Sequence, residues 1–222
     1  MDIIKHLEFF NPLEMEDSIH IIGLGAIGST VAETLTRLGL SNLHFYDFDG
    51  VVPHNIANQM YIDSDIGKLK VDCMVEHCKA INPDVEITVH KEGWKSGCKL
   101  SGYVFLCVDN IEIRKAIVLE NKYNTNIKAM FDFRMGLDDA QHYAANWADK
   151  DMVENLYRSM DFTHEEAKEA TPVSACGTTL SVITTIRVIV SLGISNMINF
   201  IKLGTIKKVM LINAFSFTVD SF

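Results

Sequence analysis

One stretch of the sequence, residues 20–29, constrains the fold more than any other. It reads His-Ile-Ile-Gly-Leu-Gly-Ala-Ile-Gly-Ser, an apolar run that ends in a G-x-G-x-x-G pattern and leads into a helical pattern. Glycine tolerates backbone dihedrals that other residues avoid, so the chain can turn sharply at Gly23. A helix that begins near Ala26 then has free backbone N–H groups, which attract an anion such as a nucleotide phosphate. We therefore expect a nucleotide site built on Gly23, Gly25 and Gly28.

The segments around this turn predict a βαβ unit. We expect a strand at 18–22, a helix at 26–38 that Gly39 ends, and a second strand at 43–46. A strand, glycine turn, helix and strand in this order favour a right-handed parallel crossover. Asp47 follows the second strand, where an acid can accept hydrogen bonds from a ribose. This much is compatible with either NAD or ATP.

The rest of the chain predicts one doubly wound, Rossmann-like α/β domain over residues 1–222, with a mainly parallel sheet and antiparallel C-terminal strands. The polar residues 51–68 predict a long loop that is functional or disordered. The acidic stretch within 149–176 predicts a crossover or lid segment, or a mobile one. Further helices are expected at 70–81, 112–123 and 178–202, with a short one within 2–17. Further strands are expected at 85–89, 103–108, 130–133, 141–147 and 208–217.

Charge and cysteine content exclude several classes of function. The net charge of −9 argues against binding along a nucleic-acid backbone, which needs clustered Lys and Arg. The five cysteines form no C-x-x-C pair, so we expect neither a disulfide framework nor a tetrathiolate zinc site. Arg187 within the apolar segment 178–200 favours a buried helix over a membrane span. The first residues lack the layout of a signal peptide, so we expect a cytoplasmic protein. We expect neither a nucleic-acid partner nor a membrane partner.

Several motifs follow one another along the chain. They are Gly25-Ala26-Ile27-Gly28-Ser29, Asp47-Phe48-Asp49-Gly50-Val51, Asn55-Ile56-Ala57-Asn58-Gln59, Gly67-Lys68-Leu69-Lys70, Asp109-Asn110 with Arg114, and Cys176-Gly177. In these motifs the chain resembles the ThiF/MoeB/HesA family of ATP-dependent adenylyltransferases, which are related to ubiquitin-activating enzymes. The resemblance extends over nearly the whole chain, and motifs that match in the same order are more specific than a lone glycine pattern.

The resemblance implies a homodimeric enzyme that uses ATP and Mg²⁺ to adenylate the C-terminal glycine of a ubiquitin-like or sulfur-carrier protein, with release of pyrophosphate. It implies that Asp47 binds the ribose and that Lys70 and Arg37 face the phosphates. It also implies that Asp109 binds Mg²⁺ or aids attack on the α-phosphate. The residues expected to hold the nucleotide are Gly23, Gly25, Ala26, Ile27, Gly28, Asp47, Asp49, Asn55, Asn58, Gln59, Lys70, Val108, Asp109 and Asn110.

Two positions leave alternatives open. Asn58 stands where the family pattern has an arginine that contacts phosphate, so part of the charge neutralisation is missing unless another cation, such as Arg134 or Arg158, replaces it. Cys176, at the start of the predicted long helix, is either a nucleophilic thiol or a small apolar side chain that packs the helix start.

Three functions therefore remain in competition. The first is an adenylating enzyme, with Asp109, Lys70 and Cys176 among the residues that carry the chemistry. The second is a nucleotide-binding partner subunit that has lost turnover, which Asn58 motivates. The third is an NAD-dependent oxidoreductase, which explains the glycines but leaves the polar loop and Asp109 without a role.

Overall fold

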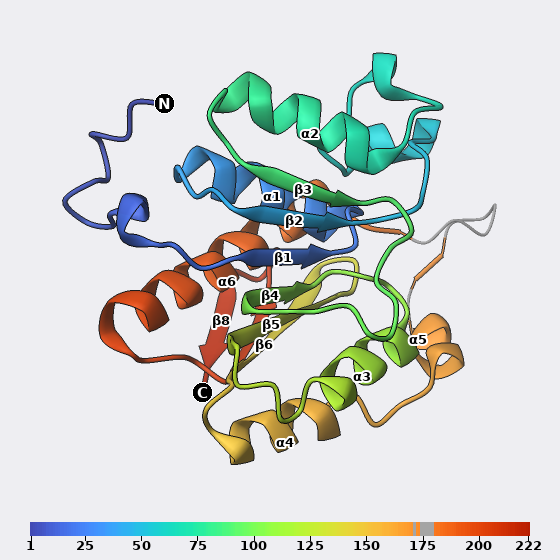
Figure 1. The fold of residues 1–222 in the computed structure, drawn as a ribbon. Coiled ribbons are helices and arrows are strands. Elements are labelled where there is room, and N and C mark those ends of the chain that lie inside the picture. Colours follow the sequence, from blue (N-terminus) through green and yellow to red (C-terminus); the bar gives the residue numbers. More distant parts are fainter. Residues whose placement is uncertain (171, 174–179) are drawn as a thin grey trace.

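An eight-stranded sheet runs through the centre of the protein, with its strands in the order β3-β2-β1-β4-β5-β6-β7-β8 (Figure 1). The computed structural model describes residues 1–170, 172–173 and 180–222. The strands are β1 Ile19–Ile22, β2 Leu43–Tyr46, β3 Ile87–His90, β4 Gly102–Leu106, β5 Ile127–Met135, β6 Asp139–Asn146, β7 Val209–Asn213 and β8 Thr218–Ser221.

The direction of the strands confirms the predicted fold class. Strands β1 to β5 pair in parallel, and β6, β7 and β8 continue the sheet antiparallel. Ile22 is in register with both Tyr46 and Leu106, so β1, β2 and β4 end at the same level. Residues that follow these strands, among them Gly23 and Asp47, therefore lie side by side at one edge of the sheet.

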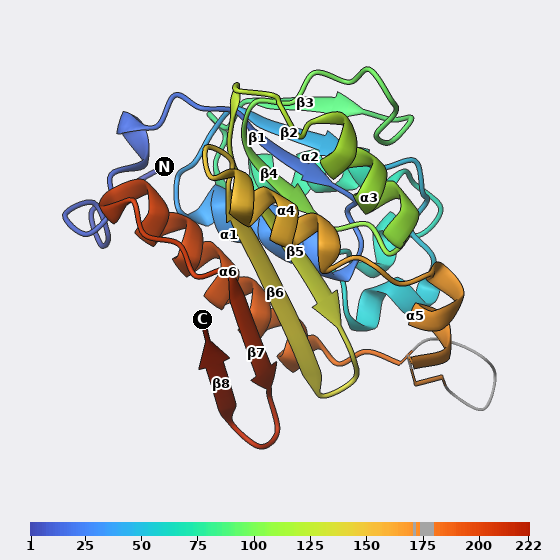
Figure 2. The same ribbon diagram turned by 90° about the horizontal axis from the view of Figure 1, so that it is seen from below.

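Helices cover both faces of the sheet (Figures 1 and 2). Helices α1, α2 and α6 pack on one face, and α3 and α4 on the other. Strands β1 and β4 are buried along their whole length, which explains why they are mostly apolar, with His20 as the polar exception. The helices are α1 Ala26–Arg37, α2 Lys70–Ile81, α3 Ile111–Glu120, α4 Lys150–Arg158, α5 His164–Ala170 and α6 Ile183–Leu203.

Helix α6 begins later than the sequence predicts. Residues 180–182 are not helical, and Val182 has an extended backbone. The side chain of Ser181 is bonded instead to Asn58 in the long polar loop, which ties the approach to α6 to that loop. The helix is long and apolar enough to cross a membrane, but its buried residues pack against α1, β5 and β6, as in the core helix of a globular domain. Gly204 ends it in the left-handed conformation.

The segment 149–170 contains two helices, where the sequence predicted an acidic crossover or lid segment, or a mobile one. The Asp149 carboxylate begins α4 by accepting hydrogen bonds from two backbone N–H groups of its first turn. The buried residues of α4 are Met152, Val153 and Leu156. Val153 and Leu156 follow Met152 by one and four positions, so the three side chains lie on one side of the helix. The sequence analysis missed this helix because a short apolar face is hidden among many charged residues.

Short 3₁₀ helices occupy two regions that were predicted differently. Residues 2–17 contain turns and the 3₁₀ helix Pro12–Glu14 where a short helix was expected. The polar loop 51–68 contains Pro53–Ala57 and Asp63–Asp65. At the C-terminus the single predicted strand is a hairpin, because the Asn213 side chain accepts hydrogen bonds from two following N–H groups and turns the chain between β7 and β8.

Three histidines and a tyrosine form a row across the neighbouring strands β1, β2 and β3. His20 in β1 stacks on His44 in β2 with ring centroids 4.4 Å apart, and Tyr46 stacks on His90 in β3 at 4.0 Å. The Ser101 N–H donates to Nε2 of His20, so the ring proton lies on Nδ1 and is donated to the Tyr46 hydroxyl. Burial and the neighbouring imidazoles lower the pKa of His20 to about 3.

We predict that this row makes the fold sensitive to acid. The unfolded chain binds a proton at His20 near pH 6.5, whereas the folded chain does so only near pH 3, so stability falls as the pH is lowered between these values. Thermal unfolding from pH 7 to pH 4 should show a shallower loss of Tm in His20→Gln than in the unaltered protein. His54→Gln, at an exposed position, is the control and should leave the slope unchanged. Equal slopes in all three proteins would refute the prediction.

Candidate functional site

The glycine turn between β1 and α1 is held by contacts that exclude a side chain. Gly23 has a φ of +93°, and a Cβ there would approach the backbone of Cys107 and Val108 to 2.8 Å. A Cβ on Gly28 would collide with the carbonyl oxygen of Gly23. These two glycines therefore let the turn pack against the end of β4 and the first turn of α1.

Gly25 differs from the other two glycines because the fold does not require it. Its φ of −71° suits any residue, and a Cβ would meet no described atom within 4 Å. Gly25 is also the N-cap residue of α1 and has no side chain to cap the helix, so N–H groups of the first turn, including those of Ala26 and Ile27, have no acceptor within the described part of the chain. Open space beside free N–H groups at a helix N-terminus is suited to a phosphate.

Asp47 connects the end of β2 to this turn. Its carboxylate accepts hydrogen bonds from the backbone N–H of Leu24 at 2.6 Å and of Asp49 at 2.8 Å. Burial raises the pKa of Asp47, while the two N–H groups and the Lys70 charge act in the opposite direction. Each oxygen can accept a further hydrogen bond, so the carboxylate can hold the turn and still accept one from a ligand.

Lys70 brings the first turn of α2 to the same edge of the sheet. Its Nζ lies 2.9 Å from Oδ2 of Asp49, and its backbone N–H donates to the Asp49 carbonyl oxygen at 2.9 Å. The Lys70 side chain is only 9% exposed, whereas that of Asp49 is 52% exposed. The structure therefore brings one buried cation beside the glycine turn, already paired with one carboxylate.

The polar loop 51–68 lies against the glycine turn through two hydrogen bonds. The Tyr61 hydroxyl donates to the Leu24 carbonyl oxygen at 2.8 Å, and the Met60 N–H donates to the Ser29 hydroxyl at 3.2 Å. Asn55 is buried and folds the loop, because its side-chain oxygen accepts the Val52 N–H.

Two amides of this loop have unused hydrogen-bonding capacity. The Asn58 side-chain nitrogen bonds the Ser181 hydroxyl. The side-chain oxygens Oδ1 of Asn58 and Oε1 of Gln59 are buried, and neither has a hydrogen-bond partner among the described residues. Buried amides with unused capacity are uncommon in a closed structure and are expected where a ligand binds.

The residues after β4 complete the edge. Asn110 caps α3, since its side-chain oxygen accepts the N–H groups of Glu112 and Ile113. Asp109 is exposed, and Val108 is held by the Arg114 side chain, whose Nε donates to the Val108 carbonyl oxygen at 2.7 Å. The fold thus presents the Asp109 carboxylate to solvent on a rigid turn beside Gly23.

The sequence analysis missed a buried charged network behind this turn. Asp132 in β5 has no exposed surface, and its carboxylate bonds both Arg114 and Arg134. Arg134 also donates to Ser159 at the end of α4 and lies over the Tyr143 ring at 4.1 Å. An acid within the otherwise apolar run 130–133 was the signal in the sequence, because such a group is buried only when it is paired.

The cations considered as replacements at position 58 are already paired. Arg134 is occupied by Asp132 and Ser159, and Arg158 is exposed and pairs with Glu154. Arg37 lies at the far end of α1 from the glycine turn and pairs with Glu33 at 2.7 Å, so the structure does not bring it to the other predicted site residues. Cys176 lies outside the described residues.

A metal ion fits this edge only together with a ligand that supplies oxygens. Among the described residues, no group of three His, Cys, Asp or Glu side chains could hold a metal. Mg²⁺ is commonly held by one or two carboxylates and the phosphates of a substrate. The exposed Asp109 carboxylate is suited to that arrangement.

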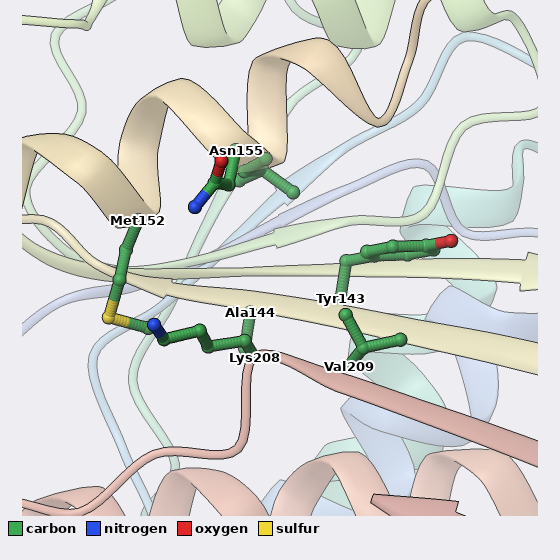
Figure 3. Close-up of a pocket in the computed structure, with 7 residues that line it drawn as sticks. Tyr143, Ala144, Met152, Asn155, Lys208 and Val209 are labelled. Carbon is green, nitrogen blue, oxygen red and sulfur yellow. The ribbon is translucent and has the colours of Figure 1, made fainter. Parts of the chain in front are cut away.

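The cavity in Figure 3 is not part of this edge. It lies between α4 and strands β6 and β7, and its volume is about 60 Å³. Pockets for drug-sized ligands are roughly 300–1,000 Å³, so this cavity is too small for a nucleotide. Its lining consists of Tyr143, Ala144, Met152, Asn155, Leu156, Lys208 and Val209.

The sheet and its glycine turn define a Rossmann-like α/β protein, and comparison with known proteins narrows this class. The chain belongs to the ThiF family, which matches residues 13–217. Ubiquitin-like modifier-activating enzyme 5 of Dictyostelium discoideum is 35% identical over 134 residues, which are 53% of this chain and 34% of that enzyme. The enzyme of the same name from Caenorhabditis elegans is 32% identical over 118 residues, which are 46% of this chain and 28% of that enzyme. The chain therefore spans only about a third of the length of these relatives.

Solved structures share the fold at low sequence identity. E. coli MccB with ATP matches with a TM-score of 0.70 and 15% identity, covering 93% of this chain and 63% of MccB. E. coli tRNA N6-threonylcarbamoyladenosine dehydratase, TcdA, matches with a TM-score of 0.65 and 16% identity, covering 89% of this chain and 92% of TcdA.

We predict that alanine substitutions at two glycines of the turn have different effects on stability, because one glycine is closely packed and the other faces open space. Gly28→Ala should destabilise the protein by about 1–3 kcal/mol or more, because the new methyl group collides with backbone. Gly25→Ala should change the free energy of unfolding by less than about 1 kcal/mol, since the methyl group enters open space. Urea unfolding measures both, and a similar loss in the two variants would contradict the assignment.

We also predict that Asp132→Asn costs about 3 kcal/mol or more of unfolding free energy, since it leaves two arginines without their shared carboxylate. The control is Glu154→Gln, which removes a partly exposed carboxylate that also pairs with two cations. The control should lose much less, because solvent screens exposed ion pairs. Equal losses in urea unfolding would show that burial of the Asp132 network adds nothing.

Proposed function

We propose that this protein uses ATP to adenylate a carboxylate at the C-terminus of a ubiquitin-like protein, a sulfur-carrier protein or a peptide. The observation that carries the proposal is that an open glycine turn, the Asp49–Lys70 ion pair and Asp109 lie at one edge of the sheet. Membership of the ThiF family supports it, as do the modifier-activating enzymes among the relatives and the match to MccB solved with ATP.

In the proposed reaction a carboxylate oxygen of the substrate attacks the α-phosphorus of ATP. The bond from that phosphorus to the oxygen that bridges to the β-phosphate breaks, and pyrophosphate leaves with the electron pair. Negative charge grows on the phosphate oxygens, so groups that hold these oxygens in position accelerate the step. The free N–H groups of Ala26 and Ile27 and the Lys70 ammonium are suited to this task.

The carboxylates at the edge would have different roles. Asp109 would hold Mg²⁺ together with the phosphates, and the metal would neutralise charge on the leaving pyrophosphate. Asp47 would accept a hydrogen bond from the ribose while it holds the turn. The amides of Asn55, Asn58 and Gln59 would line the phosphate region, where the side-chain oxygens of Asn58 and Gln59 have no partner among the described residues.

We further propose a homodimer in the cytoplasm, with Cys176 as a second candidate reactive group. Light scattering on the purified protein tests the dimer. Mass spectrometry after incubation with ATP and a carrier protein tests whether Cys176 forms a covalent adduct.

A second candidate function is a nucleotide-binding partner subunit without turnover. The observation in its favour is that Asn58 is uncharged and bonded to Ser181, so it adds no positive charge. Binding of ATP without any adenylation of a carboxylate would favour this function. Binding of NAD in preference to ATP would instead revive the oxidoreductase.

The proposed function predicts ATP–pyrophosphate exchange. With Mg-ATP and a carrier that ends in Gly-Gly, the unaltered protein should catalyse exchange of labelled pyrophosphate into ATP. Asp109→Asn should reduce the exchange rate at least about 100-fold, because the metal loses its carboxylate. Asp161→Asn is the control, as its carboxylate is exposed and lies after α4. Absence of exchange with every carboxylate tested would overturn the adenylating enzyme.

A further inference from the structure

Arg187, in the second turn of α6, lies next to the loop that covers the glycine turn. Its Nη2 atom is 3.7 Å from the Met60 sulfur. Met60 in turn donates its backbone N–H to the Ser29 hydroxyl in the first turn of α1. A short series of contacts therefore connects the Arg187 guanidinium to the end of α1 where the open glycine lies.

The charge at this edge requires a further cation if a polyphosphate binds there. The residues at the edge include three carboxylates, Asp47, Asp49 and Asp109, and the Lys70 ammonium is already paired with Asp49. Polyphosphate adds several negative charges to this set. Enzymes that transfer phosphoryl groups neutralise such charge with metal ions and with Lys or Arg side chains.

Among the residues that the structure describes, Arg187 is the arginine without a carboxylate partner. The other four arginines each have a carboxylate partner: Arg37 with Glu33, Arg114 and Arg134 with Asp132, and Arg158 with Glu154. Within the described part of the chain, Arg187 has no carboxylate within 4.0 Å, and it is exposed. The Arg187 guanidinium contacts the thioether sulfur of Met60, which is a weak acceptor that a phosphate oxygen replaces readily.

Asn58 helps to hold the start of α6, which carries Arg187, against the loop. Its side-chain nitrogen bonds the Ser181 hydroxyl, just before α6 begins at Ile183. The loop and the start of α6 are thus joined at two places, by Asn58 with Ser181 and by Met60 with Arg187. The uncharged Asn58 therefore joins the loop to the segment just before α6, and the helix carries the Arg187 charge beside it.

We propose that Arg187 is a phosphate-binding residue of this site and that Asn58 positions it through Ser181. This inference rests on the proposed function, because it takes the nucleotide at the glycine turn as the ligand. A guanidinium can bind two phosphate oxygens at once, and the β- and γ-phosphates carry most of the charge of ATP, so the proposal assigns Arg187 to them rather than to the nucleoside.

The test compares nucleotides that differ in phosphate content, using calorimetry on the full chain with Mg²⁺. Arg187→Gln should weaken binding of ATP about 10- to 100-fold and change binding of AMP less than about threefold, since one charge-assisted contact is lost. Arg187→Lys should recover part of the loss. Arg158→Gln, which removes an equally exposed arginine, should leave both affinities unchanged.

A second variant tests the positioning role of Asn58. Asn58→Ala should lose part of the ATP affinity and little of the AMP affinity, because Arg187 is retained but its approach to the site is less fixed. In Arg187→Gln, adding Asn58→Arg should restore ATP affinity, since the charge returns on the loop side. Thermal unfolding of every variant should stay close to that of the unaltered protein, as Arg187 is on the surface.

The outcomes separate this inference from the proposed function. Unchanged ATP affinity in Arg187→Gln overturns the role of Arg187, whether or not the protein adenylates a carboxylate. Normal binding of ATP by the unaltered protein without pyrophosphate exchange overturns the adenylating function and leaves the role of Arg187 intact. Equal losses of ATP and AMP affinity in Arg187→Gln also contradict the inference, because they indicate a general disturbance of the site.

Discussion

The close packing of backbone around Gly23 is the constraint on which the rest of this structure depends. The turn after β1 touches the end of β4 on one side and the first turn of α1 on the other, and neither approach leaves room for a side chain. Asp47 then fixes the turn to the end of β2 through the Leu24 N–H. Three strands and one helix therefore meet within a few residues, and Asp47, Asp49 and Asp109 take their positions from that meeting point.

Positive charge is scarce at this edge of the sheet. The chain as a whole carries a net charge of −9, and the edge itself holds more carboxylates than cations. Arg114 and Arg134 lie close in the fold, yet both are used to neutralise the buried Asp132. A polyphosphate bound here thus depends on backbone N–H groups, on Lys70, and on charge from α6. The arginines that pair with Asp132 are not available to a ligand, because an arginine that leaves a buried acid leaves that charge without a partner.

Much of the fold could be predicted, and the reasons for the exceptions are specific. The parallel strands β1, β2 and β4 and the helices α1 and α2 were predicted nearly as observed, because each has a strong local pattern or a glycine or proline at its end. Helix α4 was missed since its apolar face is only three residues, and the start of α6 was placed too early because Ser181 is bonded to the polar loop instead. Arg37 was expected near the phosphates, but a helix carries its last residues away from its first.

The sequence by itself determined the class of fold, the position of the glycine turn and the group of polar residues that follow the parallel strands. These features are local, since glycine dihedrals, strand hydrophobicity and helix periodicity depend on residues that are close together in the sequence. Only the tertiary structure decided which of the chain's charges are free. Arg158 and Glu154 are four residues apart in one helix, and Arg134 and Asp132 lie in one strand, so spacing along the chain allows these two pairs. The bond between Arg114 in α3 and Asp132 in β5 forms only when the helix packs on the sheet. Folding also brings Arg187 beside Met60, and among the described residues it has no carboxylate partner.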